Sequence, residues 1–353
     1  MKKSLIALAA LAATGAFAQS TVTLTGSFDP SVVNEKVTYG NGYDVSQNFL
    51  RNNSQGTSAM IIKGVEDLGG GMTATFLYEA DFSAAVKADG PANAALSNNS
   101  LGVLGGEVYT GLAGSLGSIK LGAANTPTLT SQASRQPIGT KLGSGFGGVL
   151  GTSHVRESNS LVYASPVFMG GLQVQLGYAF GSTADTSGAA AGRTPVNYAA
   201  PATNVGSKTD FGVFYAAGPV RTGLTRWITD ATSTGMSNTQ TNFFTQYDIG
   251  AHTLYVGAHN ETLATQVQQS GYNVAAKINV APTTNILFNY GKLSDLTNTV
   301  ALDKSILTLG ARYDLSKRTS LYTRYVSEKN ENVTAAASAK EITSMLVGVQ
   351  HNF

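Results

Sequence analysis

The chain has 353 residues, with 23 basic and 21 acidic side chains and no cysteine. The near balance of charge argues against nucleic acid as a partner, and the lack of cysteine excludes disulfides and thiolate metal sites. Forty glycines and only 12% charged residues fit neither a disordered chain nor an ordinary soluble enzyme. We expect no cofactor and no catalytic site.

The N-terminal segment has the pattern of a secretory signal peptide. Two lysines follow the first methionine, a short apolar run comes next, and Ala16 and Ala18 precede Gln19 in a small-x-small arrangement. Downstream, no run of about twenty apolar residues could form a membrane-spanning helix. We therefore expect residues 1–18 to be removed on export, and residues 19–353 to form a single domain.

The rest of the chain is dominated by alternation of apolar and polar residues, which predicts β-strands. Clear strands begin, in chain order, at Met72, Leu172, Val274 and Leu307. In residues 172–180, leucine, valine, tyrosine and phenylalanine share one face, while glutamine and glycine occupy the other. Such a strand can face lipid on one side and water on the other.

The links between strands come in two sizes that alternate along the chain. The short links are 66–71, 115–118, 218–219, 249–251, 281–284 and 316–318, and the long ones are 29–56, 124–155 and 181–207. This alternation is typical of an up-and-down barrel with short periplasmic turns and long outer loops. We predict an all-β, transmembrane antiparallel barrel of about sixteen strands, from near 21–28 to 342–353. The sheet must close, because each unpaired backbone group in lipid costs several kcal/mol.

Several segments also resemble a known family. The blocks that carry the resemblance are 62–74 (IKGVEDLGGGMTA), 109–122, 156–166, 313–319 and 347–353. They are similar to the general porins of Gram-negative outer membranes, especially the trimeric sixteen-stranded branch of beta-proteobacteria. The resemblance implies a water-filled channel for passive diffusion of small hydrophilic solutes and ions. It also implies a homotrimer in outer-membrane lipid and lipopolysaccharide, and recognition of the terminal Phe353 by the barrel-assembly machinery.

The long link after the fifth strand is the expected constriction. A porin selects by pore width and by charges at its narrowest ring, and the resemblance assigns that ring to an inward-folding loop at 124–155. This link contains Arg135 and Lys141 and no acidic residue. The alternative is a flexible external loop without a role in the pore.

Other charged residues are expected on the lumen faces of the neighbouring strands. Alternation places Lys63 inward on the second strand, Glu79 and Asp81 inward on the third, and Glu107 inward on the fourth, with Arg156 where the sixth strand begins. Charges inside strands are expected to face water because Lys or Arg on the lipid face costs about 2–4 kcal/mol at mid-bilayer. The alternative is that these charges only pair with neighbours and keep the lumen hydrated.

The sequence departs from the family at places where related porins often carry arginines that attract anions. Ala59, Gly106 with Glu107, and Ala123 occupy three of these places, and only Arg156 matches. We therefore predict weak charge selectivity of undetermined sign.

Three other functions are alternatives to a general porin. An enzyme is not favoured, because none of the four histidines has HExxH spacing or a GxSxG partner, and the glycines Gly143, Gly145 and Gly148 lack the βαβ context of a dinucleotide site. An adhesin or fibre is not favoured, because no fixed-period repeat is present. A substrate-specific channel on the same barrel remains the nearest alternative.

Overall fold

The computed structural model describes residues 20–85, 106–181, 206–230, 237–297, 303–331 and 338–353. The strands are β1 (Thr21–Phe28), β2 (Pro30–Tyr39), β3 (Asp44–Asn52), β4 (Ala59–Gly69), β5 (Met72–Asp81), β6 (Val108–Gly114), β7 (Gly117–Ala123), β8 (Ser160–Ala164), β9 (Leu172–Ala179), β10 (Lys208–Ala217), β11 (Val220–Thr229), β12 (Thr239–Ile249), β13 (His252–Thr262), β14 (Gln268–Ala281), β15 (Thr284–Asp295), β16 (Lys304–Asp314), β17 (Thr319–Asn330) and β18 (Ala339–Asn352), and the helix is α2 (Pro127–Ser134). Within these residues, no helix is long and apolar enough to cross a membrane.

The first two strands of the barrel are each broken once. β1 runs into β2 at Asp29, and β3 is separated from β4 by residues 53–58. β2 pairs with β3 and β1 pairs with β4, so the two pieces of each strand continue one hairpin. Taking each broken strand as one, the chain forms a closed antiparallel barrel of sixteen strands.

The prediction of a long link at residues 29–56 was wrong. This stretch contains β2, a short turn at residues 40–43, and β3. Its outward face carries polar cross-strand pairs, such as Asn34 with Asn48 at 2.8 Å and Lys36 with Asp44 at 2.7 Å. Polar pairs stabilise a hairpin in water but remove the alternation of hydrophobicity by which a strand is recognised.

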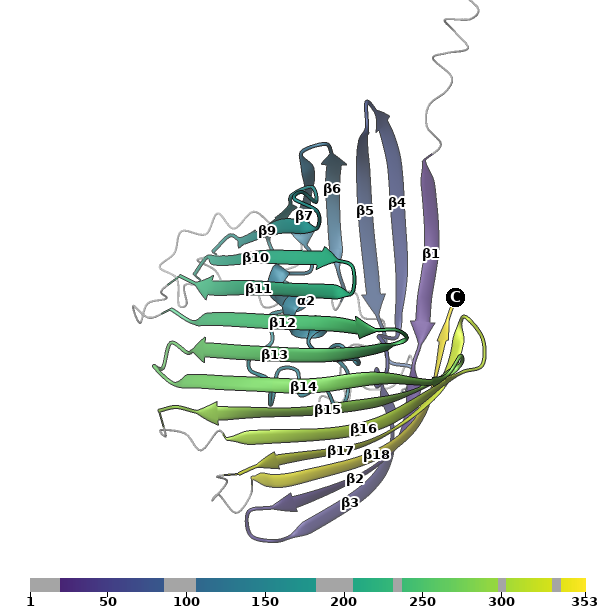
Figure 1. Ribbon diagram of the computed structural model, residues 1–353, viewed down its shortest axis with the longest axis vertical. Helices are drawn as coiled ribbons and strands as arrows, with labels where there is room; N and C mark the ends of the chain where they lie inside the picture. The colour runs from purple at the N-terminus through teal and green to yellow at the C-terminus, as the bar shows by residue number, and fades with distance from the viewer. Residues whose placement is uncertain (1–19, 86–105, 182–205, 231–236, 298–302, 332–337) are drawn as a thin grey trace, which may run out of the picture.

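The ring closes between the two ends of the chain. β18 pairs with β2 along most of its length and with β1 at its end, and β9 pairs with β10 on the other side. In Figure 1, β1, β4, β5 and β6 stand on one side of the ring and β10 to β18 sweep around the other. The predicted long link 181–207 lies almost entirely outside the described residues.

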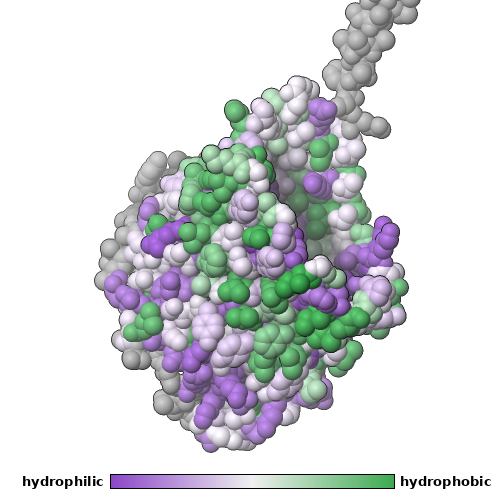
Figure 2. All heavy atoms as spheres, in the orientation of Figure 1, coloured by the Kyte–Doolittle hydropathy of each residue, from purple (hydrophilic) through white to green (hydrophobic). Residues whose placement is uncertain are grey.

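In the strands with clear alternation, the two faces differ as predicted. In β13, Leu254 and Val256 are 46% and 43% exposed on the outer face. Tyr255 and His259, which lie on the inner face of the same strand, are buried. Figure 2 shows hydrophobic side chains spread over the outer surface of the barrel. In water such a surface would be unfavourable, but it suits the hydrocarbon of a bilayer.

The turn between β4 and β5 depends on glycine. Gly69, Gly70 and Gly71 have φ values of 80°, 62° and 79°, and the Asp67 side chain accepts a hydrogen bond from the Gly69 N–H at 2.8 Å. Side chains with a Cβ rarely adopt such positive φ values, so the three glycines permit this tight reversal.

The terminal Phe353 fastens the seam of the barrel. Its backbone exchanges two hydrogen bonds with Gly26 of β1, at 3.1 and 3.0 Å. Its ring lies 6.0 Å from that of Phe28 and directly against Gly26, where an added Cβ would lie 2.3 Å from the ring. Glycine is therefore needed at position 26 for the last residue to reach the first strand.

Candidate functional site

The loop between β7 and β8 begins with the helix α2. The side chain of Thr126 caps this helix by accepting a hydrogen bond from the Leu129 N–H at 3.0 Å, and Pro127 occupies the first turn. A hydroxyl cap followed by proline is a strong helix start, because proline has no N–H to leave unsatisfied. The helix lies inside the ring against β10, β11 and β12 (Figure 1).

Hydrogen bonds and small residues hold α2 to this wall. Asp210 of β10 accepts two hydrogen bonds from Thr128, from the backbone N–H and from the hydroxyl, both at 2.8 Å. The Gln132 amide donates to Gln240 of β12 at 2.9 Å. Gly212 faces Pro127 so closely that a Cβ there would lie 3.0 Å from the proline ring.

Arg135 follows the helix and is covered on all sides. It is 1% exposed, and its guanidinium donates to the Leu150 carbonyl at 2.7 Å and to Asn242 of β12 at 3.3 Å. Gly257 of β13 makes room for it, because an added Cβ would lie 2.5 Å from the arginine side chain. Burial lowers the pKa of Arg135 to about 10, so the side chain is still charged at neutral pH.

The tip of the loop is clamped between β15–β17 and the break in the second strand. The Gly143 carbonyl accepts hydrogen bonds from Asn289 and Thr308, at 3.2 and 2.6 Å. Arg324 of β17 donates to the Leu142 carbonyl at 2.9 Å and also contacts the Ser54 carbonyl. The loop therefore crosses the lumen from one side to the other.

The returning limb of the loop lies on β11 and β13. Glu261 accepts a hydrogen bond from the Thr152 N–H at 3.1 Å. His154 stacks on Trp227, with ring centroids 3.5 Å apart and planes 17° from parallel. Burial lowers the pKa of His154 to about 4, so its imidazole is neutral at neutral pH.

These contacts confirm that the long link 124–155, the third outer loop of the barrel, folds inward. They run from β9 to β17, which we call the loop-covered wall. The strands β4 to β8 make no such hydrogen bonds with α2 or residues 135–150 in the part of the chain described, and we call them the open wall.

The open wall carries most of the predicted charged residues on one face. Ile61 pairs with Glu79 and Ala59 with Asp81, which places both acids on the side of Lys63, as predicted. Arg156 lies 3.4 Å from Glu79.

Glu107 lies near the same face and is also matched by a cation. Lys120 of β7 approaches its carboxylate at 3.0 Å, and the Asn125 N–H donates to it at 3.1 Å. Lys120 was not among the predicted residues. Its alternation with the outward Ile119 and Leu121 marks it as inward, so the signal was present in the sequence.

Lys141, at the loop tip, binds the break at residues 53–58, which leads into β4 of the open wall. Its ammonium donates to the Thr57 hydroxyl at 2.5 Å. Burial lowers the pKa of Lys141, and the nearby carboxylates of Asp81, Asp29 and Glu79 act in the opposite direction. Lys141 is therefore a cation surrounded by carboxylates at the place where the loop narrows the lumen.

A family model described as Gram-negative porin matches residues 4–333. The chain belongs to the Gram-negative porin family. It is an outer-membrane β-barrel, and the family and the fold are those of channels.

The porin is similar to several known proteins. The outer membrane porin protein 32 of Delftia acidovorans is 46% identical over 84 residues, which cover 23% of this chain and 22% of that protein. The anion-selective porin from Comamonas acidovorans has a TM-score of 0.72 at 24% identity, over 95% of this chain and 100% of that one. A loop-deletion mutant of OmpT from Vibrio cholerae has a TM-score of 0.65 at 13% identity, over 95% and 99%. At these identities the structures establish the shared fold.

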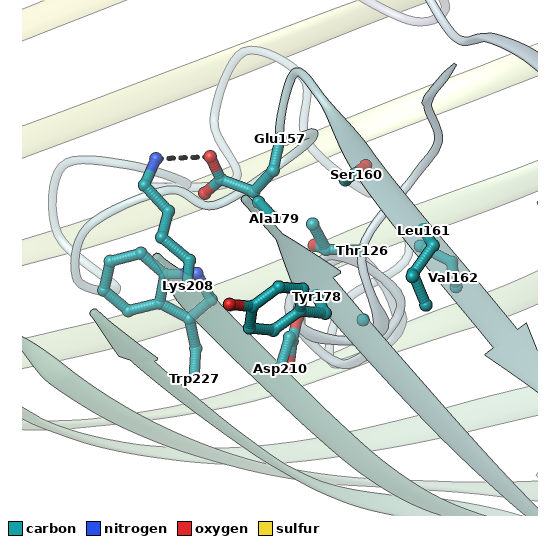
Figure 3. A pocket seen from close by; sticks show the side chains of 11 residues that line it. Thr126, Glu157, Ser160, Leu161, Val162, Tyr178, Ala179, Lys208, Asp210 and Trp227 are labelled. Carbon is teal, nitrogen blue, oxygen red and sulfur yellow. Dashed lines mark hydrogen bonds and ion pairs between the residues drawn. The ribbon is translucent and has the colours of Figure 1, made fainter. Parts of the chain in front are cut away.

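A small pocket lies where the porin's third loop meets the wall. Figure 3 shows Glu157, at the root of the loop, joined to Lys208 of β10, with Trp227 and Tyr178 beside them. Neither Lys208 nor Asp210 was among the predicted residues. Both are inward residues of β10, but only the folded loop gives them partners.

Proposed function

We propose that this porin is a general diffusion channel, with weak charge selectivity, for small hydrophilic solutes and ions. The observation that carries the proposal is the pairing of opposite charges beside the loop. Glu79 lies next to Arg156, Glu107 next to Lys120, and Lys141 within reach of Asp81. Paired charges keep a lumen hydrated while their fields largely cancel at the distance of a passing ion.

The same pairing supports a weaker anion preference than that of porins with a row of unpaired arginines. The solved porin from Comamonas acidovorans is described as anion-selective. Here Ala59 and Ala123 stand at places where related porins often carry arginine, and Glu107 adds an acid. Of the predicted constriction residues, Lys63 is exposed on the open wall, whereas Arg135 is enclosed by the loop and acts as its anchor.

A planar-bilayer experiment tests this proposal. In a potassium chloride gradient, we expect a reversal potential that corresponds to a permeability ratio within about threefold of one. Uptake of neutral sugars into liposomes is the companion measurement, and its rate is expected to fall smoothly with sugar size. A strong preference for either ion contradicts the weak selectivity. Preference for one sugar over others of the same size supports a substrate-specific channel instead.

A further part of the proposal concerns how the porin is processed and assembled. We propose that residues 1–18 are removed on export, that three copies associate in outer-membrane lipid and lipopolysaccharide, and that the barrel-assembly machinery recognises the last strand. The position of Phe353 against Gly26 is consistent with such a strand completing the barrel. Migration as a heat-sensitive oligomer in detergent gels, lost in a variant without Phe353, is the expected outcome.

A further inference from the structure

The charges that face the lumen are distributed unevenly between the two ends of the barrel. We call the half next to the short turns the short-turn half and the other the long-loop half. In the described residues, the lumen face of the short-turn half has five basic side chains, Lys63, Lys120, Arg221, Lys277 and Arg312, against three acidic ones, Asp67, Asp248 and Asp314. Apart from Asp29 and Arg324, which are buried beside residues 53–58, the long-loop half has nine acidic side chains, Glu35, Glu79, Asp81, Glu107, Glu157, Asp210, Glu261, Asp295 and Glu328, against four basic ones, Arg51, Arg156, Lys208 and Lys304.

Contacts with the loop place the basic side chains of the short-turn half on the lumen face. The Gln246 amide donates to the Ser134 carbonyl of the loop at 2.5 Å, so Gln246 points inward. Arg221 donates to the Gln246 side chain at 2.9 Å and lies 2.6 Å from Asp248. This pair therefore lines the same lumen.

Lys277 and Arg312 are placed by the period of two along a strand. Lys277 is four residues from Asn273, whose side chain donates to the loop carbonyl of Arg135. Arg312 is four residues from Thr308, which donates to the Gly143 carbonyl. Residues separated by an even number of positions share one face of a strand, so both cations point inward.

Two of these cations have no acid beside them. Arg312 lies 2.7 Å from Asp314, but no ion pair is found for Lys63 or Lys277 among the described residues. Lys63 is exposed on the open wall, and Lys277 is partly exposed on the opposite side of the ring. They are the main source of the uncompensated positive charge in this half.

The long-loop half has the opposite balance. Glu35 accepts a hydrogen bond from Ser344 at 3.3 Å, and Arg51 approaches it only at 4.0 Å. Glu328, on the lumen face of β17 with Tyr322 and Val326, adds a further acid nearby. Excess negative charge therefore lies at the end of the lumen opposite to Lys63 and Lys277.

We infer that the lumen is electrically polar along its axis, and that the channel therefore conducts ions better in one direction of the field than in the other, with Lys63 and Lys277 as specificity-determining residues. The inference rests on the proposed channel function. A negatively lined half concentrates cations and a positively lined half concentrates anions. At about 0.1 M salt the Debye length is about 10 Å, so these fields reach across much of a pore.

The sign of the asymmetry follows from which ions meet in the middle. When the long-loop side is positive, cations enter through the acidic half and anions through the basic half, so both accumulate near the loop and raise the conductance. When the polarity is reversed, both are withdrawn and the conductance falls.

Single-channel recording in planar bilayers tests this inference. In symmetric potassium chloride of about 0.1 M, we expect currents at opposite voltages of equal size to differ by about 1.5-fold. The difference is expected to vanish at about 1 M, where the Debye length is about 3 Å. Channels inserted in either orientation show the same ratio, with the favoured sign reversed.

A pair of double variants identifies the residues responsible. Lys63→Glu with Lys277→Glu makes the lumen of the short-turn half acidic, so we expect the asymmetry to be lost. Lys36→Glu with Lys329→Glu is the matched control: it changes the total charge equally, but at exposed residues on the outer face of the long-loop end. Heat-sensitive migration of each variant establishes that it has folded.

The outcomes are distinguishable. Absence of any conductance in the unmodified protein contradicts the proposed channel function. Channels with equal currents at both polarities in 0.1 M salt leave the channel intact and overturn the inference. An asymmetry that survives the lumen double variant, or that disappears in the control, also overturns it.

Discussion

The loop-covered wall and the open wall are built from the same alternating strands, yet they use their inward positions differently. The loop-covered wall presents glycine and neutral polar side chains, such as Gly212, Gly257, Gln240 and Asn273, which receive the loop backbone. The open wall presents charges in pairs, among them Glu79 with Arg156. The comparison shows that one wall of a β-barrel can serve as the packing surface for a loop while the other keeps its charged side chains clear of that loop.

The largest effect is expected from removing the main anchor of the loop. Replacement of Arg135 by methionine leaves the Leu150 carbonyl and Asn242 without their donor. We expect the free energy of unfolding to fall by about 2–4 kcal/mol, because buried partners of a charged donor become unsatisfied. Urea unfolding in lipid vesicles measures this loss, and conductance is expected to rise as the loop leaves the wall. Unchanged stability and conductance would contradict the anchoring role.

The close approach of loop and wall can be tested at a glycine. In Gly257→Ala the new methyl group would lie 2.3 Å from Asn273 and 2.5 Å from Arg135, so the loop must shift. Overpacking of this kind costs about 1–3 kcal/mol, and we expect noisier channels. Gly114→Ala is the control, because its nearest neighbour would lie at an ordinary 3.5 Å. Equal behaviour of the two variants would show that the fit at Gly257 is unimportant.

A smaller effect is expected from removing one charge of an ion pair on the open wall. Glu107→Gln removes the negative partner of Lys120 but keeps an acceptor for the Asn125 N–H. The freed ammonium is expected to raise the permeability ratio of chloride over potassium by about twofold. The reversal potential in a salt gradient measures the change, and Lys120→Gln is expected to shift it the other way. Shifts of the same sign in both variants would exclude a compensating pair.

The smallest effect concerns the pH dependence of the returning limb. Burial lowers the pKa of His154 to about 4, against about 6.5 when it is exposed. A released limb therefore binds a proton more readily than the docked one. The stability of the docked limb is therefore greatest above about pH 6.5 and falls as the pH decreases from there. Below about pH 4 it falls no further, because His154 is then protonated in both states. We expect channel noise to increase as the pH is lowered from 7 to 5. His154→Phe keeps the ring on Trp227 without the titration, so its noise is expected to stay constant over this range.

The parts of the fold that depend on local pattern could be predicted from the sequence. Alternation identified strands such as β9 and β14, and it also placed Lys63, Glu79 and Asp81 on one face. It failed at β2 and β3, where polar pairs such as Asn34 with Asn48 hide the strand. The inward course of the third loop came from the family resemblance, because no local rule connects a loop to a wall more than a hundred residues away.

The barrel follows from the sequence alone, since a period of two, short turns and the need to pair every backbone group in lipid leave few other arrangements. Which charges are enclosed and which face the water depends on the folded chain. The sequence predicts that Arg135 and Lys63 are both inward-facing basic residues. In the structure, Arg135 is buried between loop and wall, whereas Lys63 is exposed. The reason is that burial and partnership depend on distant residues, such as Asn242 and Leu150 around Arg135, that only the closed ring brings together.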